Sequence, residues 1–126
     1  MYKKILVVLV ALGLATVLLA ACGIRDINPG GGPTVHMGGA SFIQDSITIH
    51  KGDSVLMVDD AASPHIVVNG SWVNGQAVAK AEPGAPTVNL NFKGNDSTST
   101  PVFNTAGTFH LYCTLHGNMN LTVVVQ

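Results

Sequence analysis

Three side chains able to bind a transition metal lie within seven residues near the end of this 126-residue chain: Cys113, His116 and Met119. A thiolate, an imidazole and a thioether are soft or borderline ligands, which suit copper better than magnesium or calcium. Strand-like runs lead into and out of the segment, at residues 107–112 and 120–126, so we expect a tight loop between two strands. Such a loop can present all three side chains to one ion.

A fourth ligand must come from another part of the chain, and His65 is the candidate because Ser63-Pro64-His65 predicts a turn. Side chains alternate across a strand, so Cys113 shares a face with Leu111, and Tyr112 lies on the opposite face. Cys113 is therefore expected to point inward with the core, as a buried metal thiolate requires. Zinc is the alternative metal for such residues, and a methionine ligand argues against it.

The spacing Cys113-x-x-His116-x-x-Met119, with the remote His65, resembles the ligand set of type 1 (blue) copper proteins. The preceding run Ala-Gly-Thr-Phe-His-Leu-Tyr-Cys is similar to the final strands of cupredoxins such as plastocyanin and amicyanin, and the short loop resembles the amicyanin type. The resemblance covers roughly residues 35–126. It implies one copper ion that cycles between Cu(I) and Cu(II), in a trigonal plane of His65, Cys113 and His116 with Met119 as a long axial ligand.

The chain departs from the family at the residue after His65. Many cupredoxins carry an asparagine there, and its side chain ties the two ligand loops together, whereas this chain has Ile66. The backbone N–H of Ile66 remains available to the thiolate sulfur. We therefore expect ligation to survive, whereas the rigidity of the loops and the tuning of the reduction potential should change.

The resemblance also implies a route for electrons. In the family the C-terminal histidine ligand reaches the surface through an apolar patch, which Leu115, Gly117 and Pro64 would form around His116. Tyr112 resembles the surface tyrosine of plastocyanins, which is paired with an acidic patch. Such acids are sparse here, so we expect the edge at His116 to be the main electron port and Tyr112 a minor one.

The N-terminus has the pattern of a secretory signal. Lys3-Lys4 precede an apolar run, residues 5–20, which leads to Leu19-Ala20-Ala21-Cys22. This ending resembles a bacterial lipobox, so we interpret residues 1–21 as a lipoprotein signal peptide and Cys22 as the lipid-carrying first residue of the mature protein. An uncleaved transmembrane anchor is the alternative.

The rest of the chain divides into a tether and one domain. Residues 22–34 include Pro-Gly-Gly-Gly-Pro and predict a flexible tether, and residues 35–126 are predicted to form the copper domain. The signal places this domain outside the cytoplasm, anchored to the membrane by lipid and facing the periplasm or the cell exterior. Cys22 then lies outside the folded core, so Cys113 has no disulfide partner. Metal ligation explains this thiol better than an inert buried cysteine does.

The composition excludes other classes of protein. Hydrophobic residues make up 47 % of the chain and charged residues 10 %, and the net charge is −1. Without residues 1–21, four basic and seven acidic side chains remain, a net charge of −3. The chain has no run of Lys or Arg, so we expect no binding to nucleic acid. Its length fits one domain, and we expect a monomer.

Alternating patterns predict strands around residues 46–50 and 88–92, and a continuous apolar run predicts one at residues 55–58; each is followed by polar turn residues. Residues 77–82 predict a short helical turn, and Trp72 is interpreted as a core residue. Together with the resemblance, these elements indicate an all-β fold, an antiparallel Greek-key β-sandwich of the cupredoxin type.

Other titratable residues have simpler interpretations. His50 lies on the polar side of its strand and is interpreted as solvated, and His36 has no neighbouring ligand set, so neither is predicted to bind metal. Asp59-Asp60 follow an apolar run, and adjacent residues at a strand end point apart. The pair is therefore interpreted as solvated turn residues rather than as a catalytic or hard-metal pair.

Three functions can be compared. We favour a lipid-anchored one-electron carrier that exchanges electrons with redox partner proteins. A copper-binding or delivery protein is the alternative, and it would need exposed, exchangeable ligands rather than an inward-facing Cys113. An enzyme is not expected: a multicopper oxidase needs His-x-His pairs, a binuclear centre needs a second cysteine in the loop, and the chain has neither. Four protein ligands would also leave no open position for a substrate.

Overall fold

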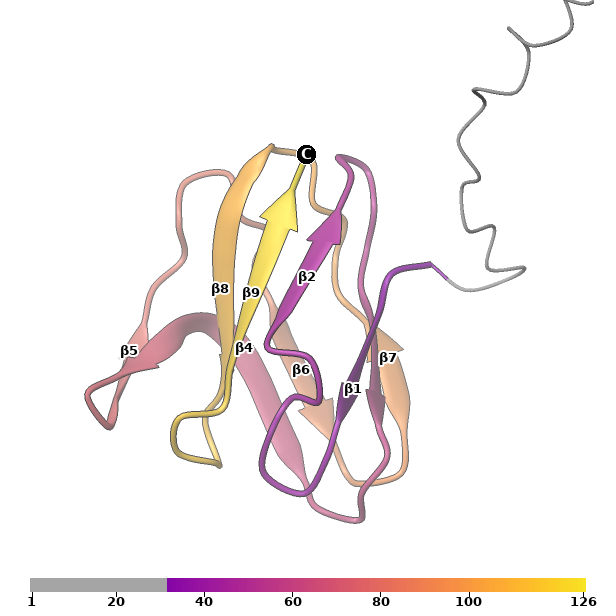
Figure 1. Cartoon of the computed structure of the whole chain (residues 1–126), viewed down its shortest axis with the longest axis vertical. Helices are drawn as coiled ribbons and strands as arrows, with labels where there is room; N and C mark the ends of the chain where they lie inside the picture. Colours follow the sequence, from indigo (N-terminus) through magenta and orange to yellow (C-terminus); the bar gives the residue numbers. More distant parts are fainter. Residues whose placement is uncertain (1–31) are drawn as a thin grey trace, which may run out of the picture.

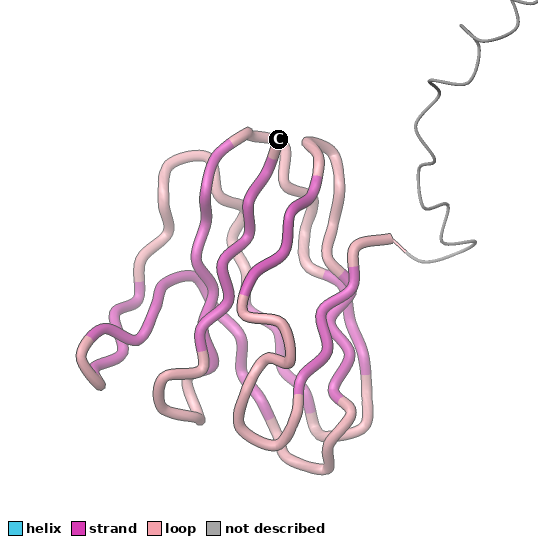
Figure 2. Tube along the Cα trace, in the orientation of Figure 1, coloured by secondary structure: helices cyan, strands magenta, loops and turns pink. Residues whose placement is uncertain are grey.

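The computed structural model describes residues 32–126, and these residues form the predicted all-β sandwich (Figures 1 and 2). The predicted signal peptide, Cys22 and the tether up to residue 31 lie outside the described residues. In the described part of the chain, no helix has the length and hydropathy needed to cross a membrane. The strands found there are β1 (Thr34–Met37), β2 (Ser46–Ile49), β3 (Leu56–Asp59), β4 (His65–Val73), β5 (Gln76–Ala79), β6 (Asn89–Phe92), β7 (Ser97–Ser99), β8 (Gly107–Cys113) and β9 (Asn120–Val125).

Two sheets form the sandwich. The larger sheet has the order β2-β9-β8-β4-β5, with β6 paired to β4, and the smaller sheet has the order β1-β3-β7. β8 and β9 pair in antiparallel register from Gly107 and Val125 to Tyr112 and Asn120, and residues 114–119 connect them. Figure 1 shows this loop and the turn before β4 at the end of the sandwich opposite the C-terminus. Both predicted ligand segments therefore lie at one end of the molecule.

Two strand pairs are parallel, so the sandwich is not antiparallel throughout as predicted. β1 pairs with β3, and β2 pairs with β9, in parallel register. The reason is topological. β1 and β2 follow each other in sequence but lie in different sheets, and only strands joined by a tight hairpin are forced to pair in antiparallel register. Each of the two strands instead joins the edge of a sheet beside a strand that runs in its own direction.

The apolar core contains the predicted sulfur ligands. Phe109, Leu111 and Cys113 are buried along β8, and Cys113 is fully buried, with 0 % exposed. β9 buries every second side chain. Met119, just before β9, belongs to the same apolar cluster. The prediction that Cys113 points inward is confirmed, and both sulfur-containing side chains are part of the packed interior.

β4 continues beyond its pairing with β8 into a hairpin with β5 (Figure 1). Gly70 has a φ of +127°, and a Cβ there would lie 2.1 Å from the carbonyl oxygen of Val78, so no larger residue fits. Asn74 and Gly75 close the hairpin with φ of +50° and +76°, the conformation that an Asn-Gly turn favours. The predicted helical turn at residues 77–82 is wrong. The Asn74-Gly75 turn pairs the residues that follow it with β4, and a few helix-forming residues cannot nucleate a helix.

Candidate metal centre

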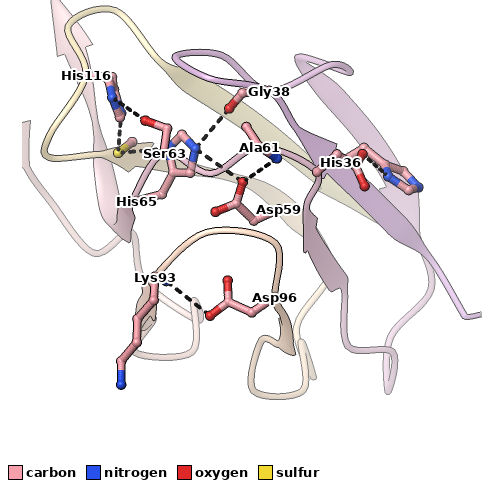
Figure 3. Close-up of polar contacts among 11 residues, drawn as sticks. His36, Gly38, Asp59, Ala61, Ser63, His65, Lys93, Asp96 and His116 are labelled. Carbon is pink, nitrogen blue, oxygen red and sulfur yellow. Dashed lines mark hydrogen bonds and ion pairs between the residues drawn. The ribbon is translucent and has the colours of Figure 1, made fainter.

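His65, Cys113 and His116 converge at one end of the sandwich (Figure 3, where sulfur is yellow). Cys113 Sγ lies 3.7 Å from His65 Nδ1 and 3.6 Å from His116 Nδ1, and the three donor atoms lie within 4.8 Å of one another. His65 is the first residue of β4, Cys113 is the last residue of β8, and His116 lies in the loop after it. The fold thus brings together three of the four residues that the sequence predicts as ligands.

Met119, the fourth predicted ligand, lies at the end of the same loop. Its side chain is buried, with 2 % exposed. The loop closes on itself, because Cys113 N donates to Met119 O at 3.0 Å and Met119 N donates to His116 O at 3.4 Å. Asn118 has a φ of +61° within this turn. These contacts hold Cys113 and Met119 next to each other on the buried side of the loop.

His65 is oriented by the contacts of its outer nitrogen. The ring is fully buried, and its Nε2 lies 2.9 Å from Gly38 O and 3.7 Å from Asp59 Oδ1. A neutral imidazole that donates from one nitrogen carries a lone pair on the other. The bond to Gly38 therefore assigns the proton to Nε2 and leaves Nδ1 able to bind a metal, and an outer partner of this kind also fixes the plane of a ligand ring.

The interpretation of Asp59 as a solvated turn residue is wrong. Asp59 is the last residue of β3, and it alternates inward with Met57, so its carboxylate is buried. Its Oδ1 accepts a hydrogen bond from Ala61 N at 3.1 Å (Figure 3), and its Oδ2 is buried without a hydrogen-bond partner among the described residues. Asp60 points outward and is exposed, as predicted. Residues 55–58 are apolar at every position, so the sequence does not show which face of β3 is buried and could not place Asp59 inside.

His116 is the most exposed of the four predicted ligands. Its ring is half-buried, and the neighbouring Leu115 is 50 % exposed. Gly117 and Pro64 are also exposed. Ser63 Oγ lies 3.3 Å from His116 Nε2, the nitrogen that faces away from the sulfur. The residues expected to form an apolar edge near His116 are therefore exposed at the surface.

A tryptophan from the β4–β5 hairpin fixes the backbone of Cys113. Trp72 Nε1 donates to Cys113 O at 2.8 Å. Asn120 in turn holds the backbone of Trp72, because Trp72 N donates to Asn120 Oδ1 at 2.7 Å and Asn120 Nδ2 donates to Trp72 O at 3.1 Å. Trp72 is half-buried and lies outside the core cluster, so the prediction of a core residue is wrong. No local pattern could reveal these supports, because they join residues that are 41 and 48 positions apart.

Tyr112 is buried, with 4 % exposed, and not a surface tyrosine as the resemblance suggested. Its ring lies edge-on to the ring of Trp72, with centroids 6.2 Å apart and planes at 89°. A Cβ on Gly70 would lie 2.9 Å from the Tyr112 ring. The β4–β5 hairpin therefore covers the face of β8 on which Tyr112 lies, and Tyr112 is not an exposed electron port.

The other described histidines lie apart from the sulfur. His50 is exposed, as predicted, and His36 Nδ1 pairs with Asp60 Oδ2 at 2.6 Å. His110 Nδ1 lies 2.7 Å from Glu82 Oε1. Burial by itself would raise the pKa of Glu82, but hydrogen bonds from the His110 side chain and from backbone N–H groups outweigh it, so the pKa lies below its ordinary value.

The converging donors fit a soft or borderline metal ion. Cys113 is the free cysteine of the described residues, and its sulfur faces two imidazole nitrogens. Both rings meet a hydrogen-bond partner at their outer nitrogen. A thiolate with two neutral imidazoles and a nearby thioether is a donor set for copper.

Comparison with known proteins identifies the family. The profile of the copper-binding proteins of the plastocyanin/azurin family matches residues 33–126. The chain belongs to this family. It is a type 1 cupredoxin, and its cofactor is one copper ion.

Solved structures of amicyanin share the cupredoxin fold of this chain. A reduced amicyanin variant is 27 % identical, has a TM-score of 0.57, and aligns over 76 % of this chain and 83 % of its own. Another reduced amicyanin variant is 26 % identical, has a TM-score of 0.59, and aligns over 77 % and 84 %. Amicyanin from Paracoccus versutus (Thiobacillus versutus) is 21 % identical, with a TM-score of 0.59 over 78 % and 84 %, which is a likeness of fold alone. No curated protein sequence gives a significant match.

Proposed function

We propose that this cupredoxin carries single electrons through one copper ion held by His65, Cys113, His116 and Met119. The observation that supports the proposal most strongly is the convergence of one sulfur and two Nδ1 atoms within 4.8 Å of one another, at the end of a packed core. The three donors come from two segments that lie far apart in the sequence, and each is held by hydrogen bonds to its neighbours in the fold.

Copper at this position supplies one-electron chemistry between Cu(I) and Cu(II). The residues of the chain keep the donor positions the same in both states. His65 is buried and bonded to Gly38 O, the backbone of Cys113 is bonded to Trp72 and Met119, and the buried sulfur atoms are shielded from water. Donors held in this way would need little rearrangement when a bound copper ion gains or loses an electron, which would make electron exchange fast.

The same geometry argues against an enzyme. Two imidazoles, a thiolate and a thioether fill the coordination positions of one copper ion, and Lewis-acid or oxidase chemistry needs an open position. A copper-delivery protein would expose its ligands, whereas His65 and Cys113 are both 0 % exposed. The burial of these two side chains therefore favours the electron carrier over a delivery protein.

Electrons leave through the edge of His116, in our proposal. His116 is the half-buried ligand, and Leu115 and Pro64 beside it are exposed. In this proposal, the exposed side chains of Leu115 and Pro64 together give a partner protein a small apolar surface on which to dock beside His116. The partners are redox proteins that supply and remove electrons, and the carrier itself is a monomer.

We further propose that the domain is exported and tethered to a membrane by lipid on Cys22. Residues 1–21 have the signal pattern, and residues 22–34 form the tether in this proposal, although β1 already begins at Thr34. In cells that export lipoproteins, Cys22→Ala should release the protein from the membrane or leave an unprocessed precursor. Unchanged lipid labelling of that variant would refute the anchor.

Cyclic voltammetry of the copper-loaded protein tests the proposed function. We expect one reversible one-electron wave whose shape persists over repeated cycles, because both oxidation states share one ligand geometry. Loss of copper in either state, or an irreversible wave, would contradict an electron carrier and favour a delivery protein.

A further inference from the structure

The two ligand loops meet at Ser63, two residues before His65. Ser63 Oγ lies 3.3 Å from His116 Nε2, a contact between residues 53 positions apart (Figure 3). His116 Nδ1 faces Cys113 Sγ at 3.6 Å, so the metal-binding lone pair belongs on Nδ1 and the proton of the neutral ring on Nε2. The Nε2–H of His116 therefore donates to the hydroxyl oxygen of Ser63. This bond joins the first ligand loop to a ligand of the second.

His116 depends on such a partner more than His65 does. The ring of His65 is fully buried and bonded to Gly38 O at 2.9 Å. The ring of His116 is half-buried and lies between exposed residues in a turn. Among residues 32–126, its side-chain hydrogen bonds go to Ser63 and Cys113. One side of the ring packs against the ring of His65, with centroids 4.8 Å apart and planes at 51°. The Ser63 hydroxyl group is the hydrogen-bond partner of Nε2, the nitrogen that faces away from the sulfur.

The residue after His65 cannot perform the same task. Ile66 has no polar side chain, and it reaches the second loop through its carbonyl oxygen, which accepts a hydrogen bond from Thr114 N at 2.8 Å. That bond fixes the backbone at the start of the loop, two residues before His116, and does not involve the imidazole. The Ser63 hydroxyl is the contact that links the first loop to the imidazole itself.

We propose that Ser63 is the positioning residue of the copper centre and takes over the tie between the loops that Ile66 cannot make. Its hydroxyl group fixes the tautomer and the ring plane of His116. A ring that is already oriented binds the ion without a search over rotamers, and it moves less when the ion gains or loses an electron. The inference rests on the proposed function in one respect, namely that His116 is a copper ligand.

Three variants of the full chain test whether the Ser63 hydroxyl group itself orients His116. Ser63→Ala removes the acceptor, Ser63→Thr keeps it, and Thr114→Ala is the matched control. Thr114 is an exposed neighbour of the same loop, and its tie to Ile66 uses the backbone N–H, which alanine retains. The first readout is nitrogen NMR of the His116 ring in the metal-free protein. The second is the copper affinity, measured by competition with a chelator.

We expect the parent, Ser63→Thr and Thr114→Ala to show one His116 tautomer, with the proton on Nε2. Ser63→Ala should show exchange between both tautomers and bind copper about 10-fold more weakly, the usual effect of losing an outer partner of a ligand. A parent-like tautomer and affinity in Ser63→Ala would overturn the proposal. So would an equal loss in Ser63→Ala and Ser63→Thr, because the hydroxyl group would then not matter. The NMR readout needs neither copper nor electron transfer, so it can fail or succeed independently of the proposed function.

Discussion

At the scale of single residues, the copper centre depends on hydrogen bonds that hold each imidazole at the nitrogen facing away from the sulfur. Cys113 is a buried thiol, normally an inert packing residue, but two imidazole nitrogens face its sulfur at 3.6 and 3.7 Å. Each imidazole is in turn bonded at its other nitrogen, to Gly38 O or to Ser63 Oγ. The donors are therefore oriented by the fold. The four proposed ligands need not contribute equally to copper binding.

Met119 should tune the centre more than it holds the metal. A thioether is a weak, long axial ligand, and Leu has nearly the same volume in the core. Met119→Leu should therefore still bind copper and remain folded, with a shifted reduction potential measured by voltammetry. Complete loss of copper from the folded variant would show that Met119 supplies much of the binding.

At the scale of elements, the β4–β5 hairpin supports the ligand strand from outside the sandwich. It bends at Gly70, covers Tyr112, and places Trp72 Nε1 on the carbonyl oxygen of Cys113. The bend is what allows these contacts, because the backbone at Val78 approaches Gly70 more closely than any Cβ permits. Stability and site geometry are therefore coupled through one glycine.

Gly70→Ala should destabilise the protein far more than Gly75→Ala. Both residues have positive φ, but a Cβ on Gly75 meets no atom within 4 Å, whereas one on Gly70 overlaps the backbone of β5. We expect Gly75→Ala to cost about 1–2 kcal/mol from backbone strain and Gly70→Ala at least about 3 kcal/mol, measured as the free energy of unfolding in urea. Equal losses in the two variants would contradict the close approach of the hairpin.

Three of the four proposed ligands and most strands could be predicted from sequence because their signals are local. Cys113, His116 and Met119 lie within seven residues, and alternation along β8 placed the thiol inside. The assignment of the remote His65 rests on the resemblance to the family. The supports could not be predicted, because Ser63, Trp72 and Asn120 reach the site only after distant segments have packed. The burial of Asp59 could not be predicted either, because the run before it is apolar on both faces of the strand and a carboxylate is usually exposed.

At the scale of the whole molecule, the ligands occupy one end of the sandwich and the C-terminus lies at the other (Figure 1). Between these ends, side-chain contacts join segments that are far apart in the sequence. One of them joins Glu82, in the connection between β5 and β6, to His110 on β8, at 2.7 Å. Because hydrogen bonds lower the pKa of the Glu82 carboxyl, we expect stability to depend on pH through a group away from the copper centre.

The contribution of Glu82 to stability should disappear in acid. Its pKa in the folded protein lies below the ordinary value of 4.5, because hydrogen bonds with His110 and the backbone outweigh burial. The contribution is therefore fully present above pH 4.5 and is lost as the pH falls through the lower, folded-state pKa. Glu82→Gln should reduce the free energy of unfolding at pH 7, and the difference from the parent should shrink below pH 4.5. A difference that stayed constant down to pH 2 would exclude an ionic role.

The absorption spectrum of the Cu(II)-loaded protein, compared with that of Cys113→Ser, tests the central claim most directly. A thiolate bound to Cu(II) in the proposed ligand set gives an intense visible charge-transfer band, and Cys113 is the thiol that faces the two imidazoles. We predict a blue parent and a Ser variant that is folded but lacks the band. A colourless parent after copper loading, or a variant that stays blue, would contradict the assignment of His65, Cys113, His116 and Met119 as the copper ligands.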